Sequence, residues 1–242
     1  MKSSEQQGTA VRVPDRWAKR FRLSFFWLIL FLGLDFILDF SCFPPPAVVK
    51  LPAKLQNIQG QASCYLQSRG REGRIQLAFY LEPPDKVRLE ILNPFGGLES
   101  ILWLKGNDAF LYVPGQRVGW SGTAGVIMAD FLGGEISADE LIGIFLGLKQ
   151  PVTSGDGWEI NYDDEGKIIG GFKNGFSFEI KKIFSGNGLP KDIYFRGGKA
   201  TAIVRVLRIK FNQVWKTNFL NPFFPQGTKT LSWEEISGLW KR

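Results

Sequence analysis

The fold of this chain is decided by the stretch from Ile75 to Ile91, which reads IQLAFYLEPPDKVRLEI. Apolar and polar residues alternate on both sides of the turn sequence Pro83-Pro84-Asp85. Alternation with a period of two residues is typical of strands that bury one face, and a short Pro-rich break joins antiparallel neighbours. The stretch therefore predicts a hairpin with one apolar face.

The same alternation recurs in short runs along most of the chain, separated by turns rich in Gly, Pro, Asn and Asp. Connections this short indicate an antiparallel meander. In the last long run, Ala200–Phe211, the apolar positions change phase after Val206, which predicts a β-bulge, or a switch between two apolar environments, where the sheet curls. The apolar positions of the other runs are Ile75, Leu77, Phe79 and Leu81; Val87, Leu89 and Ile91; Phe110 and Tyr112; Trp158, Ile160 and Tyr162; Phe176, Phe178 and Ile180; and Ile193 and Phe195.

Two segments, Thr123–Phe131 and Ser137–Leu148, have helical periodicity instead. The second opens with Ser137 and has Glu140 three residues later, the spacing of a capping box, and its apolar face includes Leu141 and Phe145. We therefore predict a mainly β (α+β) fold, in which a curved antiparallel sheet forms an incomplete, half β-barrel with a helical lid. Such a barrel can enclose an apolar cavity suited to an acyl chain; alternatively, the helices cap a filled core.

Composition limits the function. The chain has 242 residues, of which 44% are hydrophobic, with no His and two Cys. This removes imidazole catalysis, Ser-His-Asp and Cys-His nucleophiles and nearly every zinc or haem site. Carboxylate chemistry is disfavoured because the acidic run Asp163-Asp164-Glu165 reads as a hairpin turn, and no nucleotide-binding motif is present. We expect a protein that is not an enzyme and uses no cofactor or metal.

The formal net charge is +7. A basic excess fits attraction to an anionic membrane surface or to nucleic acid, but most such excesses reflect only a solvated surface. No cluster of Lys and Arg interleaved with aromatic residues marks a nucleic-acid groove, so we expect no nucleic-acid partner.

The N-terminus reads as an export signal. A basic stretch over residues 16–22 precedes the mostly apolar run Leu23–Phe40, which ends at Ser41-Cys42. Cys42 leads into Pro44-Pro45-Pro46 and resembles the acylated Cys of a bacterial lipobox, although Asp39 and Phe40 depart from that motif. We predict a signal peptide or anchor over 1–41, lipidation at Cys42 and a tether over 42–55, with an ordinary exported Cys or an uncleaved anchor as alternatives. Cys64 is expected to be a small buried residue rather than a reactive thiol.

The order of these pieces resembles the LolA/LolB family of lipoprotein carriers and receptors, and more closely its membrane-anchored receptors of LolB type. The resemblance covers about residues 58–212. It rests on Val87–Gly96 (VRLEILNPFG), Glu140–Gly147 (ELIGIFLG), Trp158–Tyr162 (WEINY) with Gly166, and Gly188–Ile193 (GLPKDI).

The resemblance implies a half-barrel of about 11 strands whose apolar interior holds the acyl chains of a lipoprotein passing to the outer membrane. The implied partners are acylated lipoprotein cargo, a periplasmic LolA-like carrier and membrane lipids. The implied location is the outer membrane, facing the periplasm, with an inner-membrane anchor as the alternative. Transfer would exchange acyl chains between two apolar sites without chemistry.

The resemblance also implies a membrane-insertion loop at Pro94, Phe95 and Gly96. A large apolar residue in a turn reads physically either as a membrane probe or as a side chain folded back into the core. The predicted cavity lining is the inward face of the sheet together with one helix residue. A register error of one residue would place all the strand residues of this set on the opposite face of the sheet. These residues are Leu77, Phe79, Leu89, Ile91, Ile101, Trp103, Phe110, Tyr112, Phe145, Phe178 and Phe195.

Residues 56–213 thus form the predicted LolB-like half-barrel, and 214–242 form a tail with a short amphipathic helix at Ser232–Trp240. That helix packs on the barrel or lies at a membrane interface. Two functions remain open: a lipoprotein receptor or carrier, and a structural or assembly envelope lipoprotein with a filled core that acts through protein–protein contacts. An open apolar cavity distinguishes them.

Overall fold

The computed structural model describes residues 50–68, 71–93, 95–147, 157–198 and 200–239. The predicted signal segment, Cys42 and Pro94 lie outside these ranges. The described part of the chain belongs to one compact unit, Val48–Arg242. Among its helices, none is both long enough and apolar enough to cross a bilayer.

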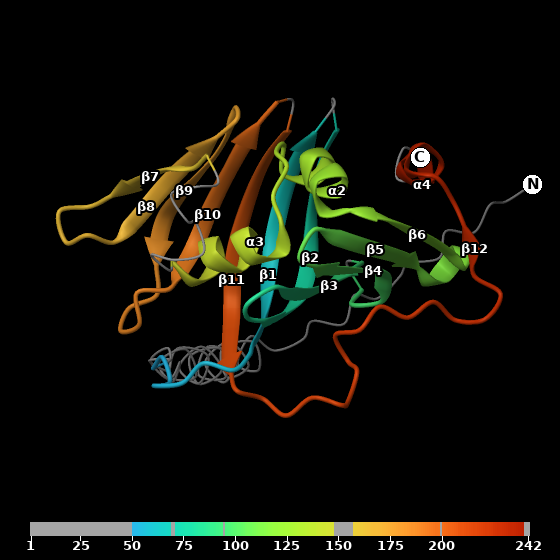
Figure 1. Cartoon of the computed structure of the whole chain (residues 1–242), viewed down its shortest axis with the longest axis horizontal. Helices are drawn as coiled ribbons and strands as arrows, with labels where there is room; N and C mark the ends of the chain where they lie inside the picture. Colours follow the sequence, from blue (N-terminus) through green and yellow to red (C-terminus); the bar gives the residue numbers. More distant parts are fainter. Residues whose placement is uncertain (1–49, 69–70, 94, 148–156, 199, 240–242) are drawn as a thin grey trace, which may run out of the picture. The chain divides into compact units, whose positions relative to one another are not determined.

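One sheet dominates this unit (Figure 1). Its first six strands form a meander, and five more strands form a second meander. The first group is β1 (Ile58–Ser68), β2 (Arg71–Glu82), β3 (Lys86–Leu92), β4 (Leu98–Lys105), β5 (Asp108–Val113) and β6 (Val118–Thr123), with a 3₁₀ turn η2 (Pro114–Gln116). The second group is β7 (Glu159–Tyr162), β8 (Ile168–Lys173), β9 (Phe176–Ile183), β10 (Pro190–Gly197) and β11 (Ala200–Phe211).

The two meanders join where β1 pairs antiparallel with β11, from Ile58 opposite Phe211 to Ser68 opposite Ala200. The strand order is β12-β6-β5-β4-β3-β2-β1-β11-β10-β9-β8-β7, so the sheet stays open. The register shifts between Gln61 and Ala62, where β11 contributes an unpaired residue, Leu207. The predicted curved antiparallel sheet and the bulge in its last long strand are both confirmed.

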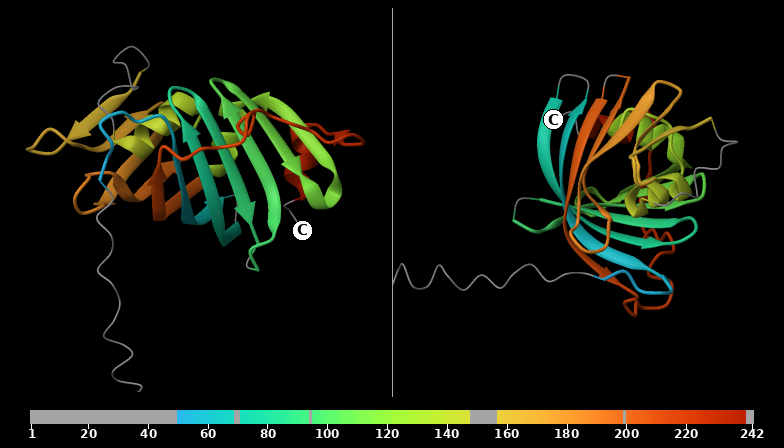
Figure 2. Two further views of the ribbon diagram at one scale, coloured as in Figure 1. Left: turned by 90° about the horizontal axis from the view of Figure 1, so that it is seen from below. Right: turned by 90° about the vertical axis from the view of Figure 1, so that its left-hand side faces the viewer.

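Two helices, α2 (Ala124–Phe131) and α3 (Ala138–Leu146), cover the concave face of the sheet (Figure 2). Both predicted helical segments are therefore confirmed. The predicted capping box is present: the Ser137 hydroxyl accepts from the Glu140 backbone amide, and the Glu140 carboxylate accepts from the Ser137 amide. Gly147 ends α3 with a φ of 58°, a left-handed conformation that glycine adopts without strain.

The core lies between the concave face and these helices. One row of directly paired residues runs across the sheet through Phe79, Leu89, Leu102, Leu111 and Trp120. Ile127 and Met128 of α2 and Leu141 and Ile142 of α3 bury their side chains against this face. Complete burial of one such side chain contributes about 1.5–3 kcal/mol, so this interface is the main source of stability.

The C-terminal tail packs against the sheet. It crosses the convex face, where Trp215 Nε1 donates to Gln59 Oε1 at 2.8 Å and Phe219 contacts Tyr80 with ring centroids 4.7 Å apart (Figure 2). It then adds β12 (Lys229–Thr230), a twelfth strand parallel to β6, and ends in α4 (Trp233–Leu239).

The end of the tail contacts the edge of the sheet and the helical cover. Trp233 of α4 packs on Trp120 with ring centroids 4.8 Å apart, and its Nε1 donates to Asp130 of α2 at 2.8 Å. Ile236 is fully buried. The tail therefore covers the edge of the sheet at β6.

Candidate functional site

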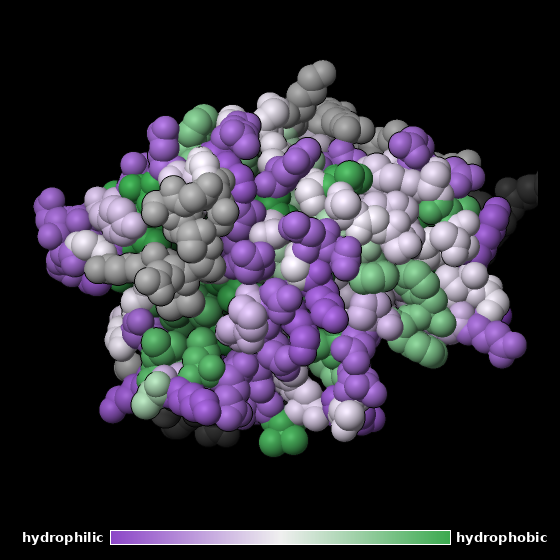
Figure 3. All heavy atoms as spheres, in the orientation of Figure 1, coloured by the Kyte–Doolittle hydropathy of each residue, from purple (hydrophilic) through white to green (hydrophobic). Residues whose placement is uncertain are grey.

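An apolar cavity lies between the concave face of the sheet and helices α2 and α3. Its volume is about 70 Å³ and every lining residue is apolar. Seen from the side of the helices, the middle of the surface is mostly polar or intermediate in hydropathy, with apolar patches beside it (Figure 3). The lining residues are Cys64, Leu66, Ile75, Leu77, Phe79, Leu81, Leu89, Ile91, Leu102, Met128, Phe131, Leu132, Leu141, Phe145, Phe195 and Val204.

The floor of the cavity comes from the inward rows of β1–β4. Gly60 of β1 lies opposite Phe79, and a Cβ atom at position 60 would come within 2.3 Å of the Phe79 ring. The missing side chain therefore lets the Phe79 ring lie over β1 and approach α3, where it meets Phe145 with ring centroids 5.7 Å apart. These two rings connect the floor of the cavity to its helical cover.

The mouth of the cavity is defined by lining residues that remain half-buried. They are Leu66, Ile75, Leu89, Ile91, Phe131 and Phe145. Ile91 lies at the end of β3, four residues before Phe95. Among these half-buried residues, Ile91 is therefore the one nearest in the sequence to the β3–β4 loop.

The β3–β4 loop exposes its apolar residue. Phe95 is 98% exposed. Asn93 Oδ1 accepts hydrogen bonds from the amides of Phe95 at 2.9 Å and Gly97 at 2.8 Å, and Gly96 takes a φ of 82°. These bonds fix the turn, and the Phe95 side chain points into solvent.

Cys64 contributes a thiol to the cavity wall. Desolvation by burial raises the pKa of Cys64 to about 12. The thiol is therefore protonated at neutral pH and behaves as a small apolar side chain. The expectation that Cys64 is a buried residue is confirmed.

Helix α3 is anchored at its N-terminus by Glu140, whose side chain is almost fully buried. The carboxylate accepts from Trp158 Nε1 at 2.7 Å and from the Ser137 amide at 2.9 Å, and forms an ion pair with Lys173. Burial of the carboxylate raises its pKa, but the hydrogen bonds from Lys173, Ser137 and Trp158 and the charge of Lys173 outweigh this, so the Glu140 pKa lies below its usual value. Glu140 thus stays ionised and holds α3 against β8.

The predicted lining residues divide into three groups. Leu77, Phe79, Leu89, Ile91, Phe145 and Phe195 line the cavity. Phe178 is buried in the same core, but it packs against Trp158 with ring centroids 5.5 Å apart and does not line the cavity.

The placement of the third group, Ile101, Trp103, Phe110 and Tyr112, is wrong. These residues lie on the convex face, in a separate cluster with Phe224 of the tail. On β4 and β5 the residues that face the core are instead Leu102, Leu104 and Leu111. Both faces of these strands are apolar because the tail covers the convex face, so alternation alone could not identify the inward face.

Several lining residues were missed, and their signals differ. Leu102 was not predicted because the residues on either side of it in β4, Ile101 and Trp103, were assigned to the inward face. Met128 and Phe131 lie on α2, and Leu132 follows it. The apolar residues of α2 are spread around the helix, so its sequence does not show which face is buried. Leu141 belongs to the apolar face of α3 that the sequence did identify. The remaining missed residues are Cys64, Leu66, Ile75, Leu81 and Val204.

No protein-family model matches the chain, and no curated protein matches it. Solved structures that the chain matches include a LolA superfamily protein from Nitrosomonas europaea, with 11% identity, coverage of 71% of this chain and 92% of that chain, and a TM-score of 0.44. A putative outer membrane lipoprotein-sorting protein domain from Vibrio parahaemolyticus shows 8% identity, coverage of 70% and 91%, and a TM-score of 0.47. A DUF1329 family protein from Desulfovibrio piger shows 9% identity, coverage of 70% and 91%, and a TM-score of 0.46.

Proposed function

We propose that this chain is a membrane-anchored envelope lipoprotein that accepts the acyl chains of other lipoproteins in its apolar cavity and helps to insert them into the outer membrane. It makes and breaks no bond and uses no cofactor. Cys42 carries its acyl anchor, and a LolA-like carrier in the periplasm delivers the cargo. Phe95 enters the bilayer during release.

The observation that carries this proposal is the wholly apolar cavity beneath two helices, together with the exposed Phe95 that follows Ile91 of its mouth in the sequence. An acyl chain is favoured over a polar ligand because no lining side chain offers a charge or a strong hydrogen-bond partner. A chain leaving the mouth near Ile91 would meet the bilayer at the point where Phe95 enters it.

The cavity must enlarge to admit cargo. Its volume of about 70 Å³ is roughly half that of the ~150 Å³ apolar cavity that holds one benzene molecule. Because Glu140 anchors the start of α3, the part of α3 that can move away from the sheet is the turn carrying Phe145. An entering acyl chain then replaces the contact between Phe145 and Phe79, which keeps the exchange close to neutral in free energy.

The small volume also favours a second candidate function. A chain whose core stays filled would act as a structural or assembly lipoprotein through protein–protein contacts. Binding of an acyl ligand separates the two functions.

The test is binding of a fluorescent triacylated lipopeptide to residues 48–242, which contain every described core residue and form one compact unit. Leu89→Trp should reduce the affinity at least tenfold, because the larger ring fills the half-buried mouth. Ile203→Trp is the matched control, since Ile203 is equally half-buried but lies outside the cavity. Failure of the folded wild type to bind would favour the structural candidate.

Delivery is tested by transfer of bound lipopeptide to liposomes. Phe95→Glu should keep the fold and the affinity for lipopeptide but abolish transfer, because a charged side chain resists entry into the bilayer. Val214→Glu is the control, since Val214 is also almost fully exposed, at 99%, but lies on the tail. Normal transfer by Phe95→Glu would exclude a role for this loop in delivery.

A further inference from the structure

Charge is unevenly distributed over the sheet. Strands β9, β10 and β11 carry seven Lys or Arg residues and two acidic residues, a net charge of +5. Strands β3–β6 carry three basic and three acidic residues, a net charge of zero. The basic excess of the sheet is therefore concentrated in the three strands next to β1.

Two of the cations on these strands are neutralised by neighbours. Arg205 Nε donates to the buried carboxylate of Asp192 at 3.0 Å, and Lys181 pairs with Glu179. Lys182 is 3.9 Å from the same Asp192 carboxylate, which already serves Arg205. Arg208 and Lys210 are exposed, and no described residue forms an ion pair with either. The positive charges of Arg208 and Lys210 therefore face solvent without an ion-pair partner among the described residues.

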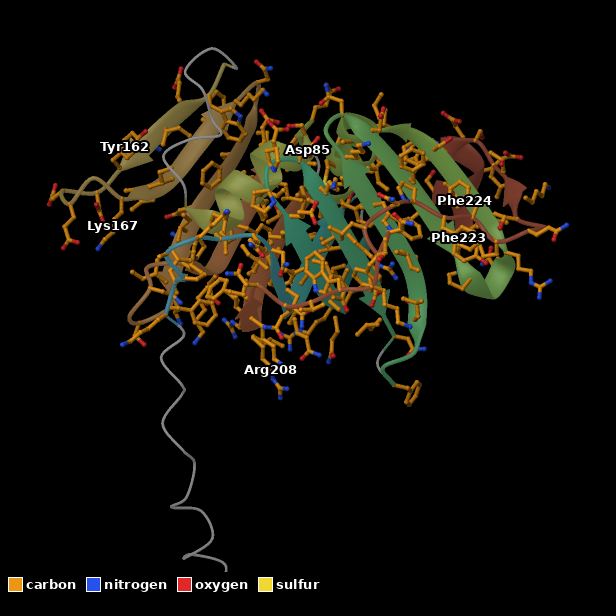
Figure 4. All side chains as sticks on the ribbon, turned by 60° about the horizontal axis from the view of Figure 1, so that its bottom comes forward. Asp85, Tyr162, Lys167, Arg208, Phe223 and Phe224 are labelled. Carbon is orange, nitrogen blue, oxygen red and sulfur yellow. The ribbon has the colours of Figure 1, made fainter. Side chains whose placement is uncertain are left out.

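The cations share the convex face. Arg205, Arg208 and Lys210 lie opposite Ser63, Gln61 and Gln59 of β1, whose side chains point away from the core. Figure 4 shows Arg208 projecting from the convex side, the side toward which the β3–β4 loop also projects. The basic surface and the exposed Phe95 loop thus face the same way.

The β-bulge adds an apolar side chain to this surface. Leu207 has no partner in β1, because Ala62 pairs with Val206 and Gln61 pairs with Arg208. Its side chain is 49% exposed, between two arginines in the sequence. A bulge re-aims a side chain in this way, and an apolar residue flanked by long basic side chains suits the boundary between lipid headgroups and acyl chains.

We propose that the convex face of β9–β11, centred on Leu207, Arg208 and Lys210, is a binding surface for an anionic lipid bilayer. The choice of a bilayer over another polyanion rests on the proposed function, because the Phe95 loop would then meet the same membrane. Each Lys or Arg near an anionic surface contributes about 1 kcal/mol to membrane binding. Loss of both Arg208 and Lys210 should therefore lower the ratio of docked to undocked protein about 30-fold or more.

The test uses the full, acylated chain reconstituted in vesicles, with an environment-sensitive dye on Leu207→Cys; the sulfur of Cys42 carries the anchor and is not free to react. Cys64 is buried and protonated and will not take the dye. The measurement is quenching of the dye by acrylamide, a neutral aqueous quencher. A dye on Glu135→Cys, an exposed position between α2 and α3, reports the opposite side of the sheet.

In vesicles containing about 30% phosphatidylglycerol, acrylamide should quench the dye at position 207 at least threefold less than in pure phosphatidylcholine. Quenching of the dye at position 135 should be the same in both lipids. About 1 M salt should remove the shielding, because it shortens the Debye length to about 3 Å. Arg208→Glu combined with Lys210→Glu should abolish it. Lys105→Glu combined with Lys229→Glu, the same change of charge at exposed sites of other strands, should not.

Three results would overturn the proposal. They are equal shielding in both lipids, no shielding in the anionic lipid, and shielding that persists after the Arg208 and Lys210 substitutions. Lipopeptide binding by the same variants separates this outcome from failure of the proposed function. Arg208→Glu with Lys210→Glu should bind lipopeptide as the wild type does, because neither residue lines the cavity.

Discussion

Replacement of Glu140 by Ala should weaken the anchor of α3 more than any exposed charge substitution would. The Trp158 indole N–H, inside the core, loses its acceptor, which costs about 1–3 kcal/mol. The Ser137 amide loses its partner in the capping box, which costs about 1 kcal/mol. The Lys173 ammonium, whose side chain is only 19% exposed, loses its counter-ion. Together these losses should lower the free energy of unfolding by about 3–5 kcal/mol, the range for breaking a buried ion pair.

Urea unfolding of residues 48–242 measures this loss. With a denaturant slope of about 2–3 kcal/mol/M, the midpoint should fall by about 1–2 M urea. Glu165→Ala is the control, because it also removes a carboxylate paired with Lys, but in an exposed turn, and it should leave the midpoint unchanged. A shift below about 0.3 M for Glu140→Ala would refute the assigned role of this carboxylate.

The same anchor predicts a pH dependence. Because the Glu140 pKa is lower in the folded protein than in the unfolded chain, its ionisation stabilises the fold fully above the unfolded pKa of about 4.3. This contribution is lost as the pH falls through the lower folded pKa. The difference in stability between the wild type and Glu140→Gln should therefore be constant from pH 7 to about pH 5 and narrow below about pH 4. A difference that stays constant down to pH 2 would contradict it.

Three further predictions follow from single contacts. Cys64 should resist Ellman's reagent at pH 8 in the folded protein and react on unfolding; fast labelling of the native state would place the thiol outside the core. Ile236→Ala should release α4, because a fully buried Ile contributes about 2–5 kcal/mol, and hydrogen exchange should rise in β12 and α4 but not in β1; unchanged exchange in α4 would contradict its docking. Gly133→Ala should lower the melting temperature by more than about 5 °C, because the φ of Gly133 is 90° and a Cβ atom there would come within 2.2 Å of the Gly197 carbonyl oxygen. Gly115→Ala is the control and should leave the melting temperature unchanged, since a Cβ atom at position 115 meets nothing within 4 Å. Equal melting temperatures for the two variants would refute this reading.

Local patterns in the sequence were sufficient to predict most of the fold. The alternation around Pro83 predicted the β2–β3 hairpin, and Ser137 with Glu140 predicted the start of α3, because each signal depends on residues close together in the chain. The twelfth strand could not be predicted, because β12 exists only through its pairing with β6, more than a hundred residues away.

The cavity was harder to predict than the fold, because its lining depends on which face of each strand is inward. On β2 and β3 only one face is strongly apolar, so Phe79 and Leu89 were assigned correctly to the concave side. On β4, Trp103 is as apolar as Leu102, and it faces Arg88, which in turn lies 4.2 Å from the ring centroid of Phe219. Only the position of the tail explains this second apolar face.

The pairing of β1 with β11 has a consequence for how the protein is made. Strands β1–β6 can form as they emerge on the far side of the membrane, since each pairs with the next along the chain. The other edge of β1 stays unpaired until Phe211 has emerged as well, and it lies in the middle of the finished sheet. An unpaired strand edge is a template for association with other chains. The nascent protein therefore has a long interval in which its most central strand is open to aggregation, and a chaperone that binds extended segments would act there, between completion of β6 and arrival of β11.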